Sequence, residues 1–128
     1  MRQSVTVLRA CGVLALGLAA ALAQTPPATT ADTSKGKALV DAKGMTLYIF
    51  DRDAAGKSNC NGQCAVNWPP LMAAADSAAS GDWSVVTRDD GGKQWAYKGK
   101  PLYAFAKDAK SGDVTGDGVN NVWHIAAP

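Results

Sequence analysis

The sequence predicts a small, mostly β single domain of two pseudo-symmetric halves, built from short antiparallel strands and hairpins with little helix. The first observation is a repeat: the frame G-x-x-L-Y-x-F-x-x-D, with a Trp fifteen residues after the Asp, occurs twice at an offset of 55 positions. Such a repeat indicates duplicated units that share a core. The second observation is that all 11 acidic residues are Asp, which favours turns and caps rather than helix interiors. Third, β-favouring runs such as MTLYIF alternate with Gly- and Asp-rich turns.

The repeat defines the predicted domain organisation. The domain is expected to cover residues 37–128, with repeats at about 37–71 and 92–126. Six residues of the first repeat recur in the second, namely Gly44, Leu47, Tyr48, Phe50, Asp53 and Trp68 as Gly99, Leu102, Tyr103, Phe105, Asp108 and Trp123.

Residues 1–23 have the pattern of a signal peptide. Two arginines flank the start of a short apolar run, and Ala21-Leu22-Ala23 is an A-x-A cleavage site. The apolar run is shorter than the roughly 20 residues that a membrane helix needs, so we interpret it as a cleaved signal and not as an anchor. We expect no transmembrane span after cleavage. Residues 24–36 are rich in Pro, Thr and Ala, which predicts a disordered linker. The protein is therefore expected to be periplasmic or secreted.

The first half is expected to begin with a hairpin. Residues 38–41 predict a short strand, and residues 45–50 predict a second strand that pairs with it across a turn at a glycine. A polar loop follows at residues 51–62. Residues 64–68 predict a helical turn, because the next two residues are prolines and stop the helix.

The second half repeats this plan. Residues 83–88 and 93–97 predict a hairpin, since the Asp-Asp-Gly-Gly segment between them is a strong turn signal. Residues 101–106 are the counterpart of the strand at 45–50. Residues 122–126 predict the closing strand.

The repeated aromatic residues are interpreted as the shared core. Each Tyr and Phe pair is spaced i, i+2, so both side chains project from one face of their strand. We expect the two Tyr hydroxyls to be hydrogen-bonded at the edge of this core. The alternative is an aromatic ligand cleft between the halves. The residues concerned are Tyr48, Phe50, Trp68, Tyr103, Phe105 and Trp123.

The two repeated aspartates end their strands. We expect Asp53 and Asp108 to cap the following loops by accepting backbone N–H bonds. The alternative is a pair of carboxylates arranged for acid–base chemistry or for a cation.

Cys60 and Cys64 remain after the signal peptide is removed. In an exported protein an even pair is most simply a disulfide. The C-x3-C spacing lacks the C-x-x-C pattern of thioredoxin-like redox sites, and two Cys with one His fall short of a four-ligand zinc site. We therefore expect a structural disulfide and no cofactor. An envelope redox or metal-handling role for this pair is the rival interpretation.

The loop D-V-T-G-D-G resembles the first half of a calcium loop, but His124 stands where the bidentate Glu would be. We expect a Gly-rich turn and no metal site. Asp113, Thr115, Asp117 and His124 are the residues that an alternative cation site would use, and copper bound by His124 with Met45 or Met72 is a further alternative.

Charge and motifs exclude several function classes. The chain has 13 basic and 11 acidic residues, and two of the basic ones lie in the signal peptide, so the mature chain is close to neutral. Nucleic-acid binding therefore has no electrostatic support. The sequence also lacks the G-x-S-x-G pattern of a serine nucleophile.

The motifs as a set resemble the bacterial secreted-repeat family, described as predicted lipoproteins with a repeated Y-x-[FWY]-x-x-D motif. They are T-L-Y-x-F-x-x-D from Thr46, C-x-G-x-C-A-x-x-W-P-P from Cys60, W-x-Y-x-G-x-P-L-Y-x-F-x-x-D from Trp95, and G-D-x-x-G-D-G from Gly112. The resemblance covers nearly the whole mature chain. It implies an exported protein and assigns no activity. The leader here lacks the lipobox of the anchored members, which favours an unanchored form.

These observations favour a non-catalytic binding or interaction module of the cell envelope. Its partner is expected to be an envelope component or a small ligand, which the sequence does not name.

Overall fold

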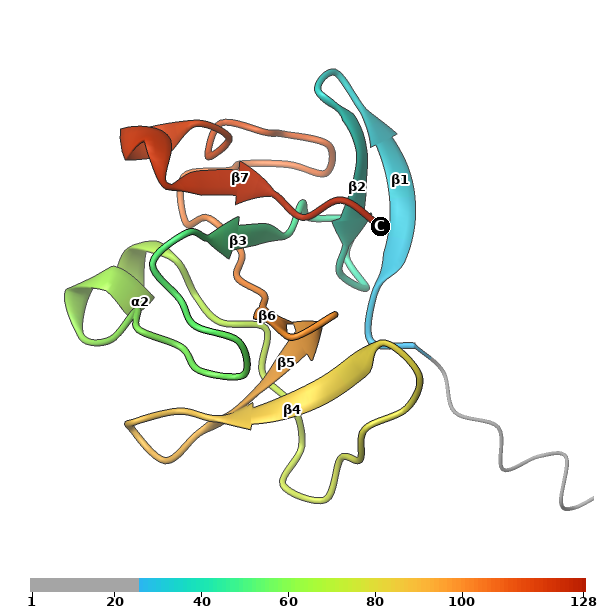
Figure 1. The fold of residues 1–128 in the computed structure, drawn as a ribbon. Helices are drawn as coiled ribbons and strands as arrows, with labels where there is room; N and C mark the ends of the chain where they lie inside the picture. Colours follow the sequence, from blue (N-terminus) through green and yellow to red (C-terminus); the bar gives the residue numbers. More distant parts are fainter. Residues whose placement is uncertain (1–25) are drawn as a thin grey trace, which may run out of the picture.

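A computed structural model describes residues 26–128, and the predicted signal peptide at 1–23 lies outside the described residues. Within them the chain forms short strands and very little helix (Figure 1). The elements are β1 (Thr29–Thr33), β2 (Gly36–Val40), β3 (Tyr48–Phe50), α2 (Gln63–Asn67), β4 (Trp83–Thr87), β5 (Lys93–Tyr97), β6 (Lys100–Pro101), the 3-10 turn η1 (Val119–Asn121) and β7 (Trp123–Ile125). The predicted mostly β fold class is confirmed.

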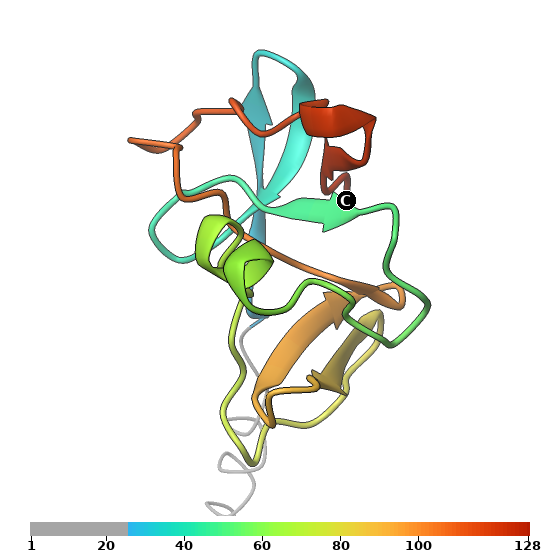
Figure 2. The same cartoon turned by 90° about the vertical axis from the view of Figure 1, so that its left-hand side faces the viewer.

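All strand pairs are antiparallel. β1 pairs with β2, β3 pairs with β7, and β4, β5 and β6 form a three-stranded sheet in that order. The β1–β2 and β4–β5 hairpins lie at opposite ends of the domain, with β3 and α2 between them (Figure 2). Each half therefore contributes one hairpin to the outside and one aromatic segment, residues 45–50 or 101–106, to the middle.

The two halves are joined at their repeated tyrosines. Tyr48 N donates to Tyr103 O at 2.7 Å, and Tyr103 N donates to Tyr48 O at 3.0 Å. On either side of this bridge the bonds recur with the 55-residue offset, because Ala126 N donates to Leu47 O at 2.8 Å and Leu71 N donates to Leu102 O at 2.9 Å. Through these bonds the C-terminal end of each half, at Leu71 or Ala126, lies against residues 101–106 or 45–50, respectively, of the other half. Neither half therefore completes its own hydrogen bonding alone.

One prediction is wrong at the start of the domain. The segment 24–36, interpreted as a disordered linker, contains β1 at Thr29–Thr33, which pairs with β2 from Thr29↔Val40 to Thr33↔Gly36. The Pro/Thr/Ala composition suggested disorder, but three threonines suit a strand once a partner strand supplies the backbone bonds. The turn is closed by Thr33 Oγ1, which donates to Gly36 O at 2.7 Å. The described fold thus begins ahead of residue 37.

The predicted strands are longer than the observed ones near the backbone bonds that join Tyr48 and Tyr103. Of residues 45–50 only Tyr48–Phe50 forms a strand, and of residues 101–106 only Pro101 belongs to β6. The remaining residues of both runs stay bonded to other segments, as when Ala104 N donates to Pro69 O at 2.8 Å. Two of them form isolated bridges only: Thr46 pairs with Val40, and Tyr103 pairs with Tyr48 and with Pro70.

The core has two parts. One is aliphatic and lies between the halves, built around Leu39, Leu47 and Leu102. The other is aromatic and lies beside α2 and the disulfide, built around the repeated Tyr and Trp residues. Neighbouring repeated leucines and tyrosines thus belong to different clusters, as expected for extended chain in which successive side chains point to opposite sides.

Candidate functional site

Four repeated aromatic rings form a continuous stack through the aromatic core. Phe50 lies on Trp123 with ring centroids 4.2 Å apart, Trp123 lies on Trp68 at 3.7 Å, and Trp68 lies on Phe105 at 4.0 Å. The interplanar angles are 11°, 2° and 20°. Because successive rings touch, no ligand fits between them. The two Trp residues are buried, and the two Phe residues at the ends of the stack are half-buried.

The repeated tyrosines close the two edges of this stack. The Tyr48 ring meets Trp68 at 5.5 Å and 80°, and the Tyr103 ring meets Trp123 at 5.2 Å and 89°. Edge-to-face contacts of this kind suit the negative face and positive edge of aromatic rings. Both tyrosines have no exposed surface.

Each tyrosine hydroxyl donates to the repeated aspartate of the opposite repeat. Tyr48 Oη donates to Asp108 Oδ2 and Tyr103 Oη donates to Asp53 Oδ2, both at 2.7 Å. The other carboxylate oxygens accept backbone N–H groups, from Asn59 to Asp53 at 2.7 Å and from Thr115 to Asp108 at 3.1 Å. The aspartates therefore hold their loops, as capping residues do, and also join the two halves, which the sequence analysis missed. The shared Tyr and Asp positions in the repeat frame were the available signal.

Electrostatics keep these hydroxyls protonated. Burial raises the pKa of Tyr48 and of Tyr103 well above the usual tyrosine value, and the neighbouring carboxylates raise both further. Burial also raises the pKa of the Asp53 carboxyl, while hydrogen bonds from the Asn59 backbone and the Tyr103 hydroxyl oppose this shift. Each Tyr is thus a fixed hydrogen-bond donor at neutral pH, which is a structural role.

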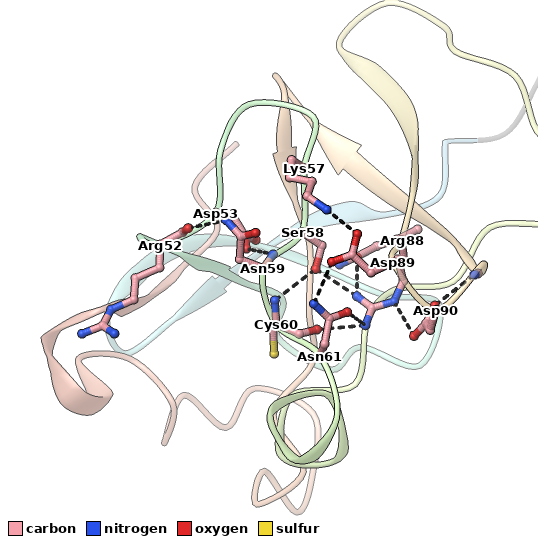
Figure 3. A network of polar contacts seen from close by, with 12 residues as sticks. Arg52, Asp53, Lys57, Ser58, Asn59, Cys60, Asn61, Arg88, Asp89 and Asp90 are labelled. Atoms are coloured by element: carbon pink, nitrogen blue, oxygen red, sulfur yellow. Dashed lines mark hydrogen bonds and ion pairs between the residues drawn. The ribbon is translucent and has the colours of Figure 1, made fainter.

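A buried arginine, Arg88, lies within a network of polar contacts that includes Ser58 and Asp90 (Figure 3). The Arg88 side chain is 1% exposed and donates to Ser58 Oγ at 3.0 Å, Gln94 Oε1 at 2.9 Å and Cys60 O at 2.9 Å. Ser58 Oγ lies 2.6 Å from Tyr103 Oη, so the guanidinium and the Tyr–Asp pair share one network. The first repeat has Thr33 at the position that matches Arg88, so the Tyr48 side of the core has no equivalent arginine.

The structure contains the expected disulfide between Cys60 and Cys64, with Cα atoms 5.2 Å apart. Cys60 is fully buried among the aromatic rings, and Cys64 is half-buried in α2. The bridge therefore ties the polar loop that follows β3 to the helix that precedes Trp68.

The residues named for an alternative cation site do not converge on one point. Asp113 Oδ2 accepts the backbone N–H of Ala109 at 2.8 Å, and Asp117 Oδ1 accepts that of Ile125 at 2.9 Å. Thr115 Oγ1 donates to Asp108, and His124 Nε2 lies 2.7 Å from Asp51 Oδ2. Across residues 26–128 no group of three or more His, Cys, Asp or Glu side chains is arranged to hold a metal ion.

A pocket of about 390 Å³ opens beside the β4–β5 hairpin and contains the other two tryptophans. Trp83 on β4 and Trp95 on β5 are each half-buried, with ring centroids 6.2 Å apart and planes at 84°. The remaining lining residues are Pro26, Pro27, Asp76, Ser77, Ala78 and Ser80. The sequence analysis did not select these tryptophans. Their position outside the repeat frame was the signal, since the repeat already assigns Trp68 and Trp123 to the core.

The first repeat differs from the second at the position of Trp95. Leu39 N donates to Ala126 O and Trp95 N donates to Leu71 O, both at 2.8 Å, so Leu39 occupies the position equivalent to Trp95. Leu39 is buried in the aliphatic core. The second repeat therefore carries a partly exposed indole where the first carries a core aliphatic side chain.

Two further grooves are lined by charged residues. One of about 350 Å³ runs along the edges of Trp68 and Trp123 and is bordered by Arg52. The other, of about 230 Å³, has Lys98 and Lys100 in its wall.

The family model described as a secreted repeat of unknown function matches the chain twice, at residues 29–72 and 84–127. The chain belongs to this family. The family resemblance predicted from the motifs is thereby confirmed. Each match extends further toward the N-terminus than the predicted repeats at 37–71 and 92–126, so that a secreted repeat includes β1 or most of β4. No curated protein and no solved structure gave a significant match to the chain.

The part of this secreted-repeat protein that the structure describes contains no helix long and apolar enough to cross a membrane.

Proposed function

We propose that this secreted-repeat protein is a non-catalytic binding module of the bacterial cell envelope, and that the Trp83–Trp95 pocket is its ligand site. The observation that carries the proposal is that the four tryptophans differ in their burial. Trp68 and Trp123 are buried in the stack, whereas Trp83 and Trp95 are only partly buried and line a concave pocket. Ligand pockets of small proteins are concave and largely apolar, with a few polar groups.

The rest of the molecule supports a scaffold role. The repeated Tyr and Asp side chains bond each other and fix the loops, and the Arg88 guanidinium donates its hydrogen bonds within a buried network. The Cys60–Cys64 bridge supports α2 against the aromatic core. A rigid scaffold of this kind positions exposed side chains for binding at low entropic cost.

The leader at residues 1–23 and the family membership support a periplasmic or secreted location for the mature chain. The ligand is accordingly an envelope component or a small molecule found there.

Equilibrium dialysis tests the proposal. The mature chain, residues 24–128, is dialysed against the small-molecule extract of the cell envelope, and retained compounds are identified by mass spectrometry. Trp95→Leu serves as the matched variant, with its melting temperature compared with that of the wild type. We expect at least one compound to be retained by the wild type, recovered with unchanged mass, and lost with Trp95→Leu. A retained set identical for both proteins would show that the pocket is not the site, and chemically altered compounds would refute the non-catalytic role.

A further inference from the structure

We propose that the Trp83–Trp95 pocket binds a methylated ammonium group, the head group of choline and of related organic cations. The inference rests on the proposed function, because it names the ligand class of the same pocket.

The two indoles meet nearly at right angles, at 84° with centroids 6.2 Å apart. A cation is attracted to the face of an indole, and aromatic side chains set around it are the usual means of holding a quaternary ammonium. A round group can contact two perpendicular walls at once.

The charge of the pocket favours a cation. Asp76 is the one ionisable residue in the lining, which contains neither Lys nor Arg. The Asp76 side chain is exposed, and within residues 26–128 it forms no ion pair. The other two grooves differ in this respect, because Arg52 borders one and Lys98 and Lys100 line the other. A carboxylate without a cationic neighbour attracts a positive ligand over distances up to about 8–10 Å at physiological salt.

The size and polarity of the pocket favour a small methylated group over a lysine side chain. At about 390 Å³ the pocket lies at the lower end of the range for small-molecule sites. A primary ammonium is strongly hydrated and needs several acceptors to replace its water. The pocket offers it one carboxylate and two serine hydroxyls, Ser77 and Ser80. A methylated ammonium loses little hydration, and the hydroxyls can bond a polar substituent such as the choline hydroxyl.

Isothermal titration of the mature chain with choline, and with its neutral isostere 3,3-dimethyl-1-butanol, tests the charge directly. We expect choline to bind at least tenfold more tightly than the isostere, since the two share shape and differ in charge. Asp76→Asn should weaken choline binding about fivefold to tenfold. Asp32→Asn is the control for the loss of one surface carboxylate elsewhere, because Asp32 is also exposed but lies on the opposite hairpin, where it pairs with Lys37, and it should leave the affinity unchanged.

Substitutions of Trp95 separate a cation–π contact from an apolar one. Trp95→Phe should retain part of the choline affinity, and Trp95→Leu should abolish it, with melting temperatures checked for each variant. Flotation with vesicles of phosphatidylcholine, compared with phosphatidylglycerol vesicles, distinguishes a lipid head group from free choline as the source. Vesicle binding blocked by free choline would assign the lipid, and binding of free choline alone would assign the soluble cation.

Several outcomes would overturn the inference. Equal binding of choline and its isostere, no heat from choline, or full affinity in Trp95→Leu would each exclude a methylated ammonium in this pocket. The dialysis experiment is independent of these results. A neutral compound retained through Trp95 would leave the binding function in place and remove only the cation, whereas dialysis that fails together with choline would remove both.

Discussion

Replacing Gly116 by Ala should destabilise the fold, because the added methyl group would enter the aromatic stack. A Cβ atom at Gly116 would lie 2.8 Å from Trp68 Cζ3, 2.9 Å from Trp68 Cη2 and 3.0 Å from Phe105 Cδ2. Trp68 cannot move aside, since it is held between Trp123 and Phe105 with centroids 3.7 and 4.0 Å away. Overpacking of a filled core costs about 1–3 kcal/mol. For a domain of this size that lowers the melting temperature by roughly 4–8 °C per kcal/mol.

Gly92→Ala is the matched control. Like Gly116, Gly92 does not have a positive φ, and its Cβ would approach a neighbour at 2.9 Å. That neighbour is the terminal methyl of Met72, which is 54% exposed and free to rotate away. Thermal denaturation followed by near-ultraviolet circular dichroism, which reports on the stacked indoles, should show a loss for Gly116→Ala several times that for Gly92→Ala. Equal melting temperatures for the two variants would refute the idea that the stack is tightly packed.

Three further predictions concern the core. Phe50→Ala and Phe105→Ala should each cost about 2–4 kcal/mol, below the full range for a buried Phe because both rings are half-buried, and should melt the whole chain in one transition; separate transitions in calorimetry would contradict the interlocked halves. Replacing Cys60 and Cys64 by Ser should lower the free energy of unfolding in urea by about 2 kcal/mol and leave the pocket's ligand binding intact; a thiol–disulfide exchange activity in the wild type would support the redox rival instead. Burial raises the pKa of Asp53 in the folded chain, so its contribution to stability is largest below the unfolded value and is lost as pH rises through the folded pKa; the stability of the wild type relative to Asp53→Asn should therefore decline with rising pH, and the opposite slope would contradict the burial of this carboxyl.

The repeat made the fold class and the grouping of the aromatic residues accessible from sequence. Period-2 spacing of Tyr48 and Phe50 places both on one face, and duplication at a fixed offset indicates two halves with a common core. The bonding of each repeated tyrosine to the aspartate of the other repeat could not be predicted in the same way. Whether Tyr103 bonds the Asp of its own repeat or that of the other, 50 residues away, depends on long-range strand pairing, which local patterns do not encode.

The start of the domain was missed for a different reason. Composition predicted disorder for the segment that forms β1, but Thr29–Thr33 gains its backbone bonds from β2. Aligning the two halves over the hairpin as well as the aromatic frame would have revealed it, because β4 occupies the equivalent place in the second repeat.

The candidate site lies where the repeat is broken. Trp83 and Trp95 have no aromatic counterpart in the first repeat. Ala28 lies 55 positions before Trp83, and Leu39 occupies the hydrogen-bonding position equivalent to that of Trp95; both contribute to the aliphatic core. Sequence symmetry identifies residues needed by both halves, so it directs attention toward the scaffold. The loop that contains Asp76 lies beside Trp83 and Trp95 only because of the way the chain folds, so sequence patterns do not place it in the pocket.

The account's central claim is that the two unrepeated tryptophans bind a ligand while the two repeated ones hold the scaffold. A nitrogen-15 NMR spectrum of the mature chain gives one indole N–H signal for each of the four tryptophans, so a titration with the envelope small-molecule extract examines all of them together. The account predicts that the signals of Trp83 and Trp95 shift while those of Trp68 and Trp123 stay in place. Shifts at Trp68 and Trp123 with Trp83 and Trp95 unmoved would contradict it.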